Sequence, residues 1–217
     1  MINKKINYWK KTTTLVKLKK SLKNDKISIS STDTILGFLA SLTLSSYQKL
    51  NELKGGRQDK PYLILIASPV KLTYFIQIEN ITTHITHLLA ACWPGPVTLI
   101  FKANPTLPAF LSSGSGTIAL RCPNHTGLQN LLVDFEGLFS TSANKSGKPA
   151  PNNPEEIEHD ILEKIEYIIL DGEKQQPSLL PSTILDLTSP DGTVRVVREG
   201  SYPVSTLEKI YGTPFKK

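Results

Sequence analysis

Cysteine is nearly absent from the sequence. The two thiols, Cys92 and Cys122, each lie beside a proline-containing turn, and they form neither a CxxC pair nor a spacing typical of a metal site. A disulfide framework and a cysteine-rich zinc site are therefore excluded. We expect both residues to be reduced packing side chains in a cytoplasmic compartment.

Long apolar runs are also missing. The longest, such as YLILIA at 62–67, have the length of a strand and fall well short of the ~20 residues that a membrane-spanning helix needs. The basic N-terminus, MINKKINYWKKTTTLVKLKK, lacks the unbroken apolar core of a secretion signal. The sequence therefore predicts a cytoplasmic protein with no membrane partner.

Several motifs of known chemistry are absent as well. There is no GxxxxGK[ST] loop, no GxGxxG and no HExxH. His84 and His87 are three residues apart on an expected helix and could face one metal, but no third ligand is nearby. Ser142 and Lys145 match the SxxK motif of penicillin-recognising serine enzymes, without the SDN and KTG elements that this chemistry needs. Surface histidines and a chance match are the alternatives in these two cases.

The composition is typical of a folded globular protein. Of 217 residues, 39% are hydrophobic and 20% are charged, which is enough apolar material for a core. We expect one domain over residues 1–217, with its core at about 12–200 between a basic N-terminal segment and a C-terminal tail. The net charge of +6 and the pI near 9.2 favour an anionic partner, such as a nucleotide, RNA or an acidic surface.

Helical and strand-like segments alternate along the chain. Apolar spacing predicts a helix over 12–23, and the alternation in KISIS predicts a strand over 26–30. STDTILGF is interpreted as a strand-to-helix junction in which Ser or Thr is the N-cap. Further helices are expected at about 44–54, 81–93, 126–135 and 153–161, and further strands at 62–67, 97–103, 116–123, 137–144, 166–171, 182–188 and 193–200. This order predicts a mixed α/β domain with a twisted, open, mixed sheet flanked by helices.

Cations and glycines cluster in the loop KGGRQDKP. Lys54, Arg57 and Lys60 surround two glycines between a helix and a strand. Glycine lets a backbone approach a ligand closely, and Lys and Arg neutralise phosphate charge. A phosphate-binding loop and a solvated turn are both consistent with this pattern.

Two strands carry arginines. Thr117 and Arg121 are four residues apart, so they share one face of a strand, and a charge inside TIALRCP is costly unless it binds an anion or a partner. Arg195 and Arg198 are three apart, which predicts opposite faces, with one of them a candidate ligand and the other on the surface.

Seven stretches resemble, in the same order, the motifs of the YrdC-like family, the threonylcarbamoyl-adenylate synthases of tRNA modification. They cover residues 12–200 and are STDTILGF, KGGRQDKP, WPGPVTLIF, TIALRCP, STSANKSGKPAP, STILDLT and VVREG. The length is similar to that of single-domain members. The resemblance implies a twisted open sheet flanked by helices, with a basic concave cavity.

The resemblance also implies a reaction. L-Threonine, bicarbonate (or CO2) and ATP would form threonylcarbamoyl-AMP and pyrophosphate, with Mg2+ on the phosphates. A separate transferase complex would then modify tRNAs that read ANN codons. Such chemistry needs positioning and charge neutralisation rather than a protein nucleophile.

The matched motifs assign the site residues. On the threonine side they are Thr34, Arg121, Ser142 and Ser182. On the ATP side they are Lys54, Arg57, Lys60, Thr117, Asn144, Asn152 and Arg198, with Lys54 and Arg57 as the catalytic cations.

The sequence also departs from the family pattern. Gly56 takes the usual place of the loop arginine, so Arg57 is displaced by one residue, and Leu36, Ser31 and Leu65 replace a tyrosine, a proline and a histidine. An alternative function is therefore a catalytically altered relative that binds RNA, as in ribosome maturation. The sequence has no stacked aromatic platform for reading single strands.

Overall fold

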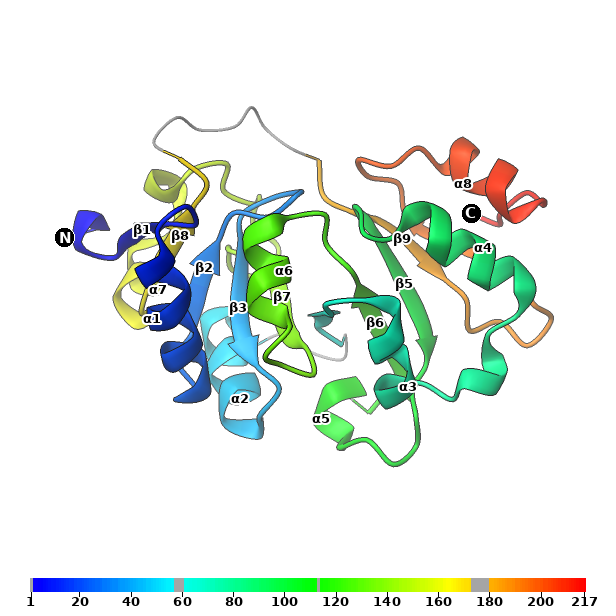
Figure 1. Ribbon diagram of the computed structural model, residues 1–217, viewed down its shortest axis with the longest axis horizontal. Coiled ribbons are helices and arrows are strands. Elements are labelled where there is room, and N and C mark those ends of the chain that lie inside the picture. The colour runs from blue at the N-terminus through cyan, green and yellow to red at the C-terminus, as the bar shows by residue number, and fades with distance from the viewer. Residues whose placement is uncertain (1, 57–60, 113, 173–179) are drawn as a thin grey trace. The chain divides into compact units, whose positions relative to one another are not determined.

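The computed structural model describes residues 2–56, 61–112, 114–172 and 180–217 (Figure 1). Its Cα positions group into two compact units, and each unit is built from two separate chain segments. Unit 1 comprises Met1–Gln58 and His125–Leu179, and unit 2 comprises Asp59–Asn124 and Leu180–Lys217. The expectation of a single domain over 1–217 stays a prediction. Both units are mixed α/β, which confirms the predicted fold class.

The sheet of unit 1 has the order β1-β8-β2-β3-β7. Its strands are β1 (Ile6–Tyr8), β2 (Ser28–Ser30), β3 (Gly37–Ser41), β7 (Leu138–Ser142) and β8 (Ile168–Leu170). Strand β8 is parallel to both β1 and β2, whereas β3 is antiparallel to β2 and to β7. Strands β2 and β7 therefore run in the same direction.

Helices cover this sheet because one side of each is apolar. Helix α1 (Thr12–Lys23) has the predicted bounds and buries Leu18 and Leu22 completely. It packs on β2 and β3 and on helix α6 (Thr126–Leu132), while α2 (Leu44–Leu53) packs on β3 (Figure 1). The remaining helical segments of unit 1 are η1 (Ile2–Lys4), η4 (Pro154–Glu156) and α7 (His159–Lys164).

The sheet of unit 2 has the order β4-β6-β5-β9-β10. Its strands are β4 (Leu63–Leu65), β5 (Val97–Lys102), β6 (Thr117–Arg121), β9 (Thr183–Asp186) and β10 (Arg195–Arg198). Pairs β4/β6 and β5/β9 are parallel, and pairs β5/β6 and β9/β10 are antiparallel. The two longest helices, α4 (Thr83–Cys92) and α8 (Val204–Tyr211), pack on each other (Figure 1). Shorter helical segments are η2 (Pro69–Lys71), α3 (Leu72–Phe75), η3 (Ile78–Asn80) and α5 (Ala109–Ser112).

Cys92 and Cys122 are free and buried in unit 2, as predicted. Burial, the largest of several effects, raises the pKa of the Cys92 thiol to about 12. This thiol is therefore protonated at neutral pH and is not a nucleophile.

The predicted strand-to-helix junction at STDTILGF is wrong. A turn follows β2, and the chain returns as the antiparallel strand β3. The hydroxyl of Thr32 accepts a hydrogen bond from the backbone N–H of Thr34 (3.0 Å) and donates to the carbonyl of Ile35 (2.8 Å), which closes the turn. A Cβ on Gly37 would lie 3.2 Å from Ser140 Oγ, so a glycine suits this tightly packed strand position.

The helix expected from 153 is also corrected. A 3-10 turn at Pro154–Glu156 has Asn153 as its N-cap, and α7 begins only at His159. Extended backbone at Ile157 and Glu158 separates the two segments. The carboxylate of Glu156 accepts from the backbone N–H of Asn152 (2.9 Å) and from Asn153 Nδ2 (2.5 Å). These hydrogen bonds satisfy polar groups within the 3-10 turn. The turn therefore ends at Glu156 and does not continue into α7.

A substitution at Gly127 tests how tightly α6 packs on the N-terminal segment. A Cβ at this position would lie 2.4 Å from Trp9 Cδ2. We expect Gly127→Ala to lower the free energy of unfolding by about 1–3 kcal/mol because the indole must move. Gly172→Ala is the matched control, since no atom lies within 4 Å of its added Cβ. Urea denaturation followed by tryptophan fluorescence measures both, and equal stabilities would contradict the prediction.

Candidate active site

The candidate residues of unit 1 gather at one edge of its sheet. Because β2 and β7 run in the same direction, their carboxyl ends meet at that edge. Thr34 follows β2, Ser142 ends β7 and Asn144 follows it, while Gly37 pairs with both Ser30 and Ser142. Loops at the carboxyl ends of strands are the usual position of binding sites in α/β sheets.

Thr34 is buried and forms hydrogen bonds within its own turn. Its side-chain oxygen lies 3.0 Å from that of Thr32. A hydroxyl has one proton, and Thr32 donates its proton to Ile35 O, so Thr34 is the donor between the two threonines. The hydroxyl of Thr34 therefore has a defined orientation.

Lys54 connects α2 to the loop after β7. Its side chain is 3% exposed, and Nζ donates to the carbonyls of Ser142 (3.0 Å) and Asn144 (2.5 Å). The Nζ atom also lies 5.9 Å from the centroid of the Phe38 ring. The carbonyl of Lys54 accepts from the backbone N–H of Ser146 (3.0 Å). The ammonium group thus organises the loop directly.

Asn144 is held by its amide nitrogen. Nδ2 donates to the carbonyls of Lys145 (2.8 Å) and Lys148 (2.6 Å), which fixes the orientation of the amide. Its Oδ1 is buried and has no hydrogen-bond partner among the described residues. A buried acceptor of this kind suits a donor on a ligand, because leaving it unsatisfied costs free energy.

The SxxK interpretation of Ser142 and Lys145 is contradicted. Lys145 Nζ lies 2.5 Å from Asp160 Oδ2. The hydrogen bond to Asp160 is the main effect that raises the pKa of Lys145. Because the Lys145 ammonium is bound to Asp160, the structure does not place it as the general base that a serine acyl-enzyme needs.

Asp171 follows β8 at the same edge of the sheet. Its Oδ1 accepts from His125 Nε2 (2.8 Å), and His125 Nδ1 accepts from the backbone N–H of Leu128 (3.1 Å) at the start of α6. The hydrogen bond from His125 holds the pKa of the Asp171 carboxyl below its ordinary value. The Trp9 ring lies 5.4 Å from the imidazole between centroids. These contacts join β1, β8 and α6.

Three candidate residues of unit 2, Arg121, Ser182 and Arg198, also lie at one edge, where β6 ends, β5 and β9 begin and β10 ends. Ser182 Oγ lies 2.8 Å from Thr98 Oγ1. Arg198 Nε and Nη2 donate to the carbonyl of Ser182 at 3.1 and 2.9 Å, and Nη2 lies 3.3 Å from its hydroxyl. The guanidinium group therefore fixes the position of Ser182.

Arg121 adds a second guanidinium to this edge. It ends β6 and is 3% exposed. Burial, and then the charge of Arg121, lower the pKa of Arg198, although part of the Arg198 side chain remains exposed. Both groups stay protonated at neutral pH, since an arginine begins from a pKa above 12. An anion bound near both guanidinium groups would offset the repulsion between them.

The prediction that Arg195 and Arg198 point to opposite faces is wrong. The register shifts between Val196 and Arg198, so the two arginines pair with Asp186 and Ile184. These partners are two residues apart on β9 and share one face, and cross-strand partners lie on the same side of a sheet. Arg195 Nη2 binds Asp186 Oδ2 (2.6 Å), whereas Arg198 binds Ser182.

Four further predicted residues lie apart from these groups or outside the described residues. Thr117 begins β6 and Arg121 ends it, so the two are separated by about 13 Å along the strand. Thr117 Oγ1 lies 2.9 Å from Ser115 Oγ. Arg57 and Lys60 lie outside the described residues, so their assignments stay predictions. Asn152 is exposed beside the 3-10 turn of unit 1.

Sequence reasoning missed Thr32 and Thr98. Both are buried, and each positions a predicted site residue, Thr34 or Ser182. The sequence could have indicated both residues. Thr98 lies inside the apolar run PVTLIF, and Thr32 lies near a second threonine in STDT, and a buried hydroxyl needs a hydrogen-bond partner.

Among the described residues, no group of three His, Cys, Asp or Glu side chains could hold a metal ion. The His84 ring instead lies beside the Tyr211 ring, with centroids 5.6 Å apart and planes tilted by 48°. None of the helices described is both long and apolar enough to cross a membrane.

The fold and these two polar edges define a mixed α/β protein whose buried lysine, paired arginines and oriented hydroxyls suit an anionic ligand. The family model described as "Sua5_yciO_yrdC: Telomere recombination" matches residues 20–200. The chain belongs to this family, and the resemblance inferred from the motifs is confirmed.

Two similar proteins have names that state an activity. The threonylcarbamoyl-AMP synthase of Pyrococcus abyssi is 31% identical over 197 residues, which are 88% of this chain and 55% of that protein. The putative threonylcarbamoyl-AMP synthase of Methanocaldococcus jannaschii is 30% identical over 193 residues, which are 88% of each chain. This chain thus spans about half the length of the first relative and most of the second.

Solved structures agree on the fold. Pyrococcus abyssi Sua5 complexed with L-threonine superposes with a TM-score of 0.84 at 28% identity, over 95% of this chain and 60% of that one. Escherichia coli YciO superposes with a TM-score of 0.77 at 22% identity, over 91% of this chain and 94% of that one. The second likeness supports the fold alone.

Lys54 tests the loop after β7. We expect Lys54→Met to lower the free energy of unfolding by about 1–3 kcal/mol, because the carbonyls of Ser142 and Asn144 lose a buried donor. Lys102→Met, at the exposed end of β5, is the control. Urea denaturation measures both variants. Equal stability of Lys54→Met and the control would contradict the structural role of the ammonium.

The lowered pKa of Asp171 predicts how the stability of the fold depends on pH. Its pKa is lowered in the folded state, so its contribution to stability is present above the unfolded value of about 3.9 and is lost as pH falls through the folded value. Wild type should therefore be more stable than Asp171→Asn above about pH 5, with the difference shrinking below about pH 4. Urea titrations across pH 3–7 measure this difference. A difference that stays constant down to about pH 3 would contradict the prediction.

Proposed function

We propose that this chain is a nucleotidyltransferase that forms L-threonylcarbamoyl-AMP and pyrophosphate from L-threonine, bicarbonate or CO2, and ATP. The observation that carries the proposal is the pair of polar strand edges, one with a buried lysine and one with two neighbouring arginines, in a member of the Sua5/YrdC family. The names of the relatives and the threonine complex of Pyrococcus abyssi Sua5 support it.

The proposed chemistry balances without a protein nucleophile. The threonine amine attacks the carbon of CO2, or of bicarbonate with loss of water, and gives a carbamate after losing a proton. A carbamate oxygen then attacks the α-phosphorus of ATP, and pyrophosphate leaves. The protein contributes position and charge neutralisation, which act most strongly where charge develops on the phosphates.

The residue roles follow the two edges. Thr34, Ser142, Ser182 and Arg121 are proposed to bind threonine, with Arg121 facing its carboxylate. Lys54, Arg57, Lys60, Thr117, Asn144, Asn152 and Arg198 are proposed to bind ATP. The buried Oδ1 of Asn144 is an acceptor for an N–H of the nucleotide. Lys54 supports this group by ordering the loop that carries Asn144.

Mg2+ is proposed to enter with ATP. Among the described residues, no three His, Cys, Asp or Glu side chains form a group that could hold a metal ion. Binding as MgATP uses phosphate oxygens as ligands, which Mg2+ prefers. A separate transferase complex is the proposed consumer of the product, with ANN-decoding tRNA as the acceptor.

Arg198 and Arg195 form a matched test on one strand. Purified protein is incubated with MgATP, bicarbonate and labelled L-threonine, and the adenylate and pyrophosphate are quantified. We expect Arg198→Gln to lower turnover by about 100-fold, because it removes a charge proposed to face the phosphates. Arg195→Gln should stay within about twofold, since Arg195 binds Asp186 and not Ser182.

Two results would overturn the proposal. If wild type forms neither the adenylate nor pyrophosphate, the chain is not a synthase, and the alternative of an RNA-binding relative gains support. If both arginine variants lose activity equally, the assignment of Arg198 to the nucleotide is wrong. Omission of bicarbonate should abolish product and serves as the control for carbamate formation.

A further inference from the structure

The backbone that follows β10 is attached to the residues at the start of β9. The ladder between these two strands ends at the pair of Arg198 and Ile184, after the register shift in β10. Beyond that pair, the backbone N–H of Ser201 donates to the carbonyl of Pro181 (2.9 Å). The loop at 199–202 is therefore held to β9 outside the regular ladder.

One buried hydroxyl, that of Thr183, makes three hydrogen bonds to this loop. Thr183 is fully buried. Its Oγ1 donates to the carbonyl of Tyr202 (2.5 Å) and accepts from the backbone N–H groups of Gly200 (2.9 Å) and Tyr202 (3.3 Å). A hydroxyl has one proton and two acceptor lone pairs, so these bonds use it completely. The side chain thus replaces the backbone ladder at this point.

Gly200 shows how closely the loop approaches β9. A Cβ on this residue would lie 2.0 Å from the carbonyl oxygen of Pro181 and 2.6 Å from the carbonyl carbon of Ser182. Only glycine permits such an approach of two backbones. The position of the loop is therefore restricted by packing as well as by hydrogen bonds.

The Arg198 side chain depends on the same part of β9. Its Nε and Nη2 donate to the carbonyl of Ser182, the residue before Thr183. The guanidinium is thus attached to Ser182, and the backbone just after Arg198 is attached to Thr183. Two consecutive residues hold both parts of the arginine.

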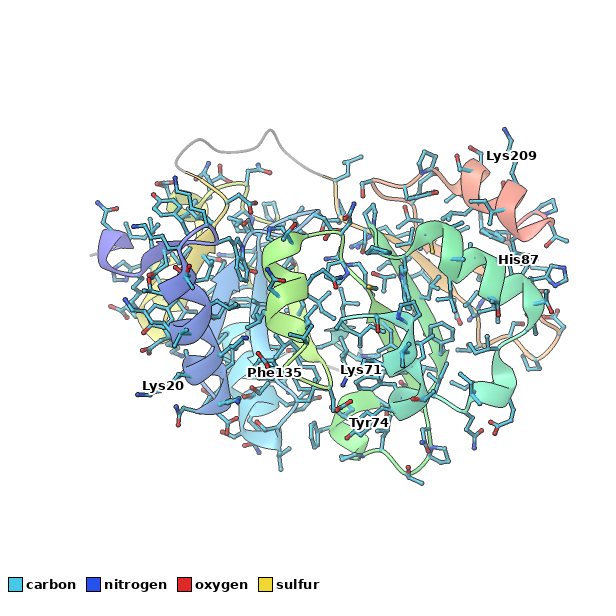
Figure 2. All side chains as sticks on the ribbon, in the orientation of Figure 1. Lys20, Lys71, Tyr74, His87, Phe135 and Lys209 are labelled. Carbon is cyan, nitrogen blue, oxygen red and sulfur yellow. The ribbon has the colours of Figure 1, made fainter. Side chains whose placement is uncertain are left out.

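The far side of the loop is attached to α8. Glu199 Oε1 accepts from the backbone N–H of Val204, the first residue of that helix (3.1 Å). Leu207 is fully buried, whereas Lys209 points outward from α8 (Figure 2). The loop therefore lies between a packed helix and the hydroxyl of Thr183.

We propose that Thr183 is a positioning residue, which holds the backbone after Arg198 and so fixes the guanidinium at the edge of unit 2. Because Thr183 is fully buried, it acts through Arg198 and not by contact with a substrate. Its effect on catalysis rests on the proposed function. A positioning error of about 1 Å costs about 100-fold in rate. A threonine that only stabilised the fold would leave the arginine unaffected.

The first test follows the Nε proton of Arg198 by NMR, with its signal identified by its absence in Arg198→Gln. Thr183→Val keeps the shape of the side chain and removes the hydroxyl. We expect this proton to exchange with water at least about tenfold faster in Thr183→Val, because the loop opens locally more often. Thr183→Ser keeps the hydroxyl and should stay within about twofold of wild type.

Thr183→Ala is a second variant for the same test. It leaves room for water at the freed backbone groups, which makes it less prone to unfold than Thr183→Val. Exchange of the Arg198 proton should again be faster than in wild type. Circular dichroism checks that each variant is folded.

The second test is a double-mutant cycle on turnover with MgATP. Thr183→Val should lower kcat/KM for MgATP by about 10- to 100-fold. Combined with Arg198→Gln, it should stay within about threefold of Arg198→Gln alone, because the residue through which it acts is already gone. A threonine that acted independently of Arg198 would instead give losses that multiply.

Thr188→Val is the matched control. The hydroxyl of Thr188 donates to Asp186 Oδ1 (2.6 Å) at the other end of β9, so the control removes a hydroxyl that does not touch the loop. Both the exchange rate of the Arg198 proton and kcat/KM should stay within about twofold of wild type.

Either of two results would overturn the proposal. One is an unchanged exchange rate of the Arg198 proton in both Thr183→Val and Thr183→Ala. The other is a loss of turnover in Thr183→Val that is equally large when Arg198 is already glutamine. If wild type forms no adenylate, the proposed function fails, and the exchange measurement alone decides the role of Thr183.

Discussion

The contact on which unit 1 most depends is that of the buried Lys54 ammonium with two backbone carbonyls. A cation with 3% exposure is costly unless its protons are satisfied, and Ser142 and Asn144 supply acceptors. Because α2 ends at this lysine, the position of a helix is coupled to the loop after β7. That loop in turn orients the Asn144 amide, whose buried oxygen is an acceptor at the candidate site.

Unit 2 uses the same arrangement of donor and acceptor, with a guanidinium in place of the ammonium. There the backbone carbonyl of Ser182 accepts from a guanidinium at the sheet edge, and an anion bound near both Arg121 and Arg198 would offset the repulsion between them. In the proposed reaction, all nucleophiles come from the substrates. An enzyme for such a reaction needs oriented hydrogen-bond donors more than a reactive side chain, and the two sheet edges provide such donors. The high pKa of Cys92 and the pairing of Lys145 with Asp160 agree with that division of labour.

The sequence predicted the parts of this protein that depend on local periodicity. Helix α1 has the bounds expected from the spacing of Leu18 and Leu22, and the fold class followed from alternating helices and strands. The turn at Thr32 was missed because it depends on side-chain hydrogen bonds, which leave no periodic signal. The register shift after Val196 was missed because alternation assumes an unbroken ladder.

The site residues were found by type and motif, but their contacts were not predictable. Nothing local to KGGR indicates that the Lys54 ammonium is bound to carbonyls about 90 residues further along the chain. The sequence predicted only that Thr117 and Arg121 share one face of a strand, whereas the structure places them at opposite ends of β6. Motif order identifies a family, whereas tertiary contacts determine what each side chain does.

The position of β8 between β1 and β2 has a consequence for biosynthesis. Ile6 pairs with Ile168, so β1 cannot join its sheet until the segment that contains Ile168 has been made. During translation, β1 therefore has no strand to pair with until β8 has been synthesised. Pairing at such long sequence separation is slow, because loop closure must precede it. Formation of the unit 1 sheet thus requires β1 to pair with a strand that is more than 150 residues away in the sequence.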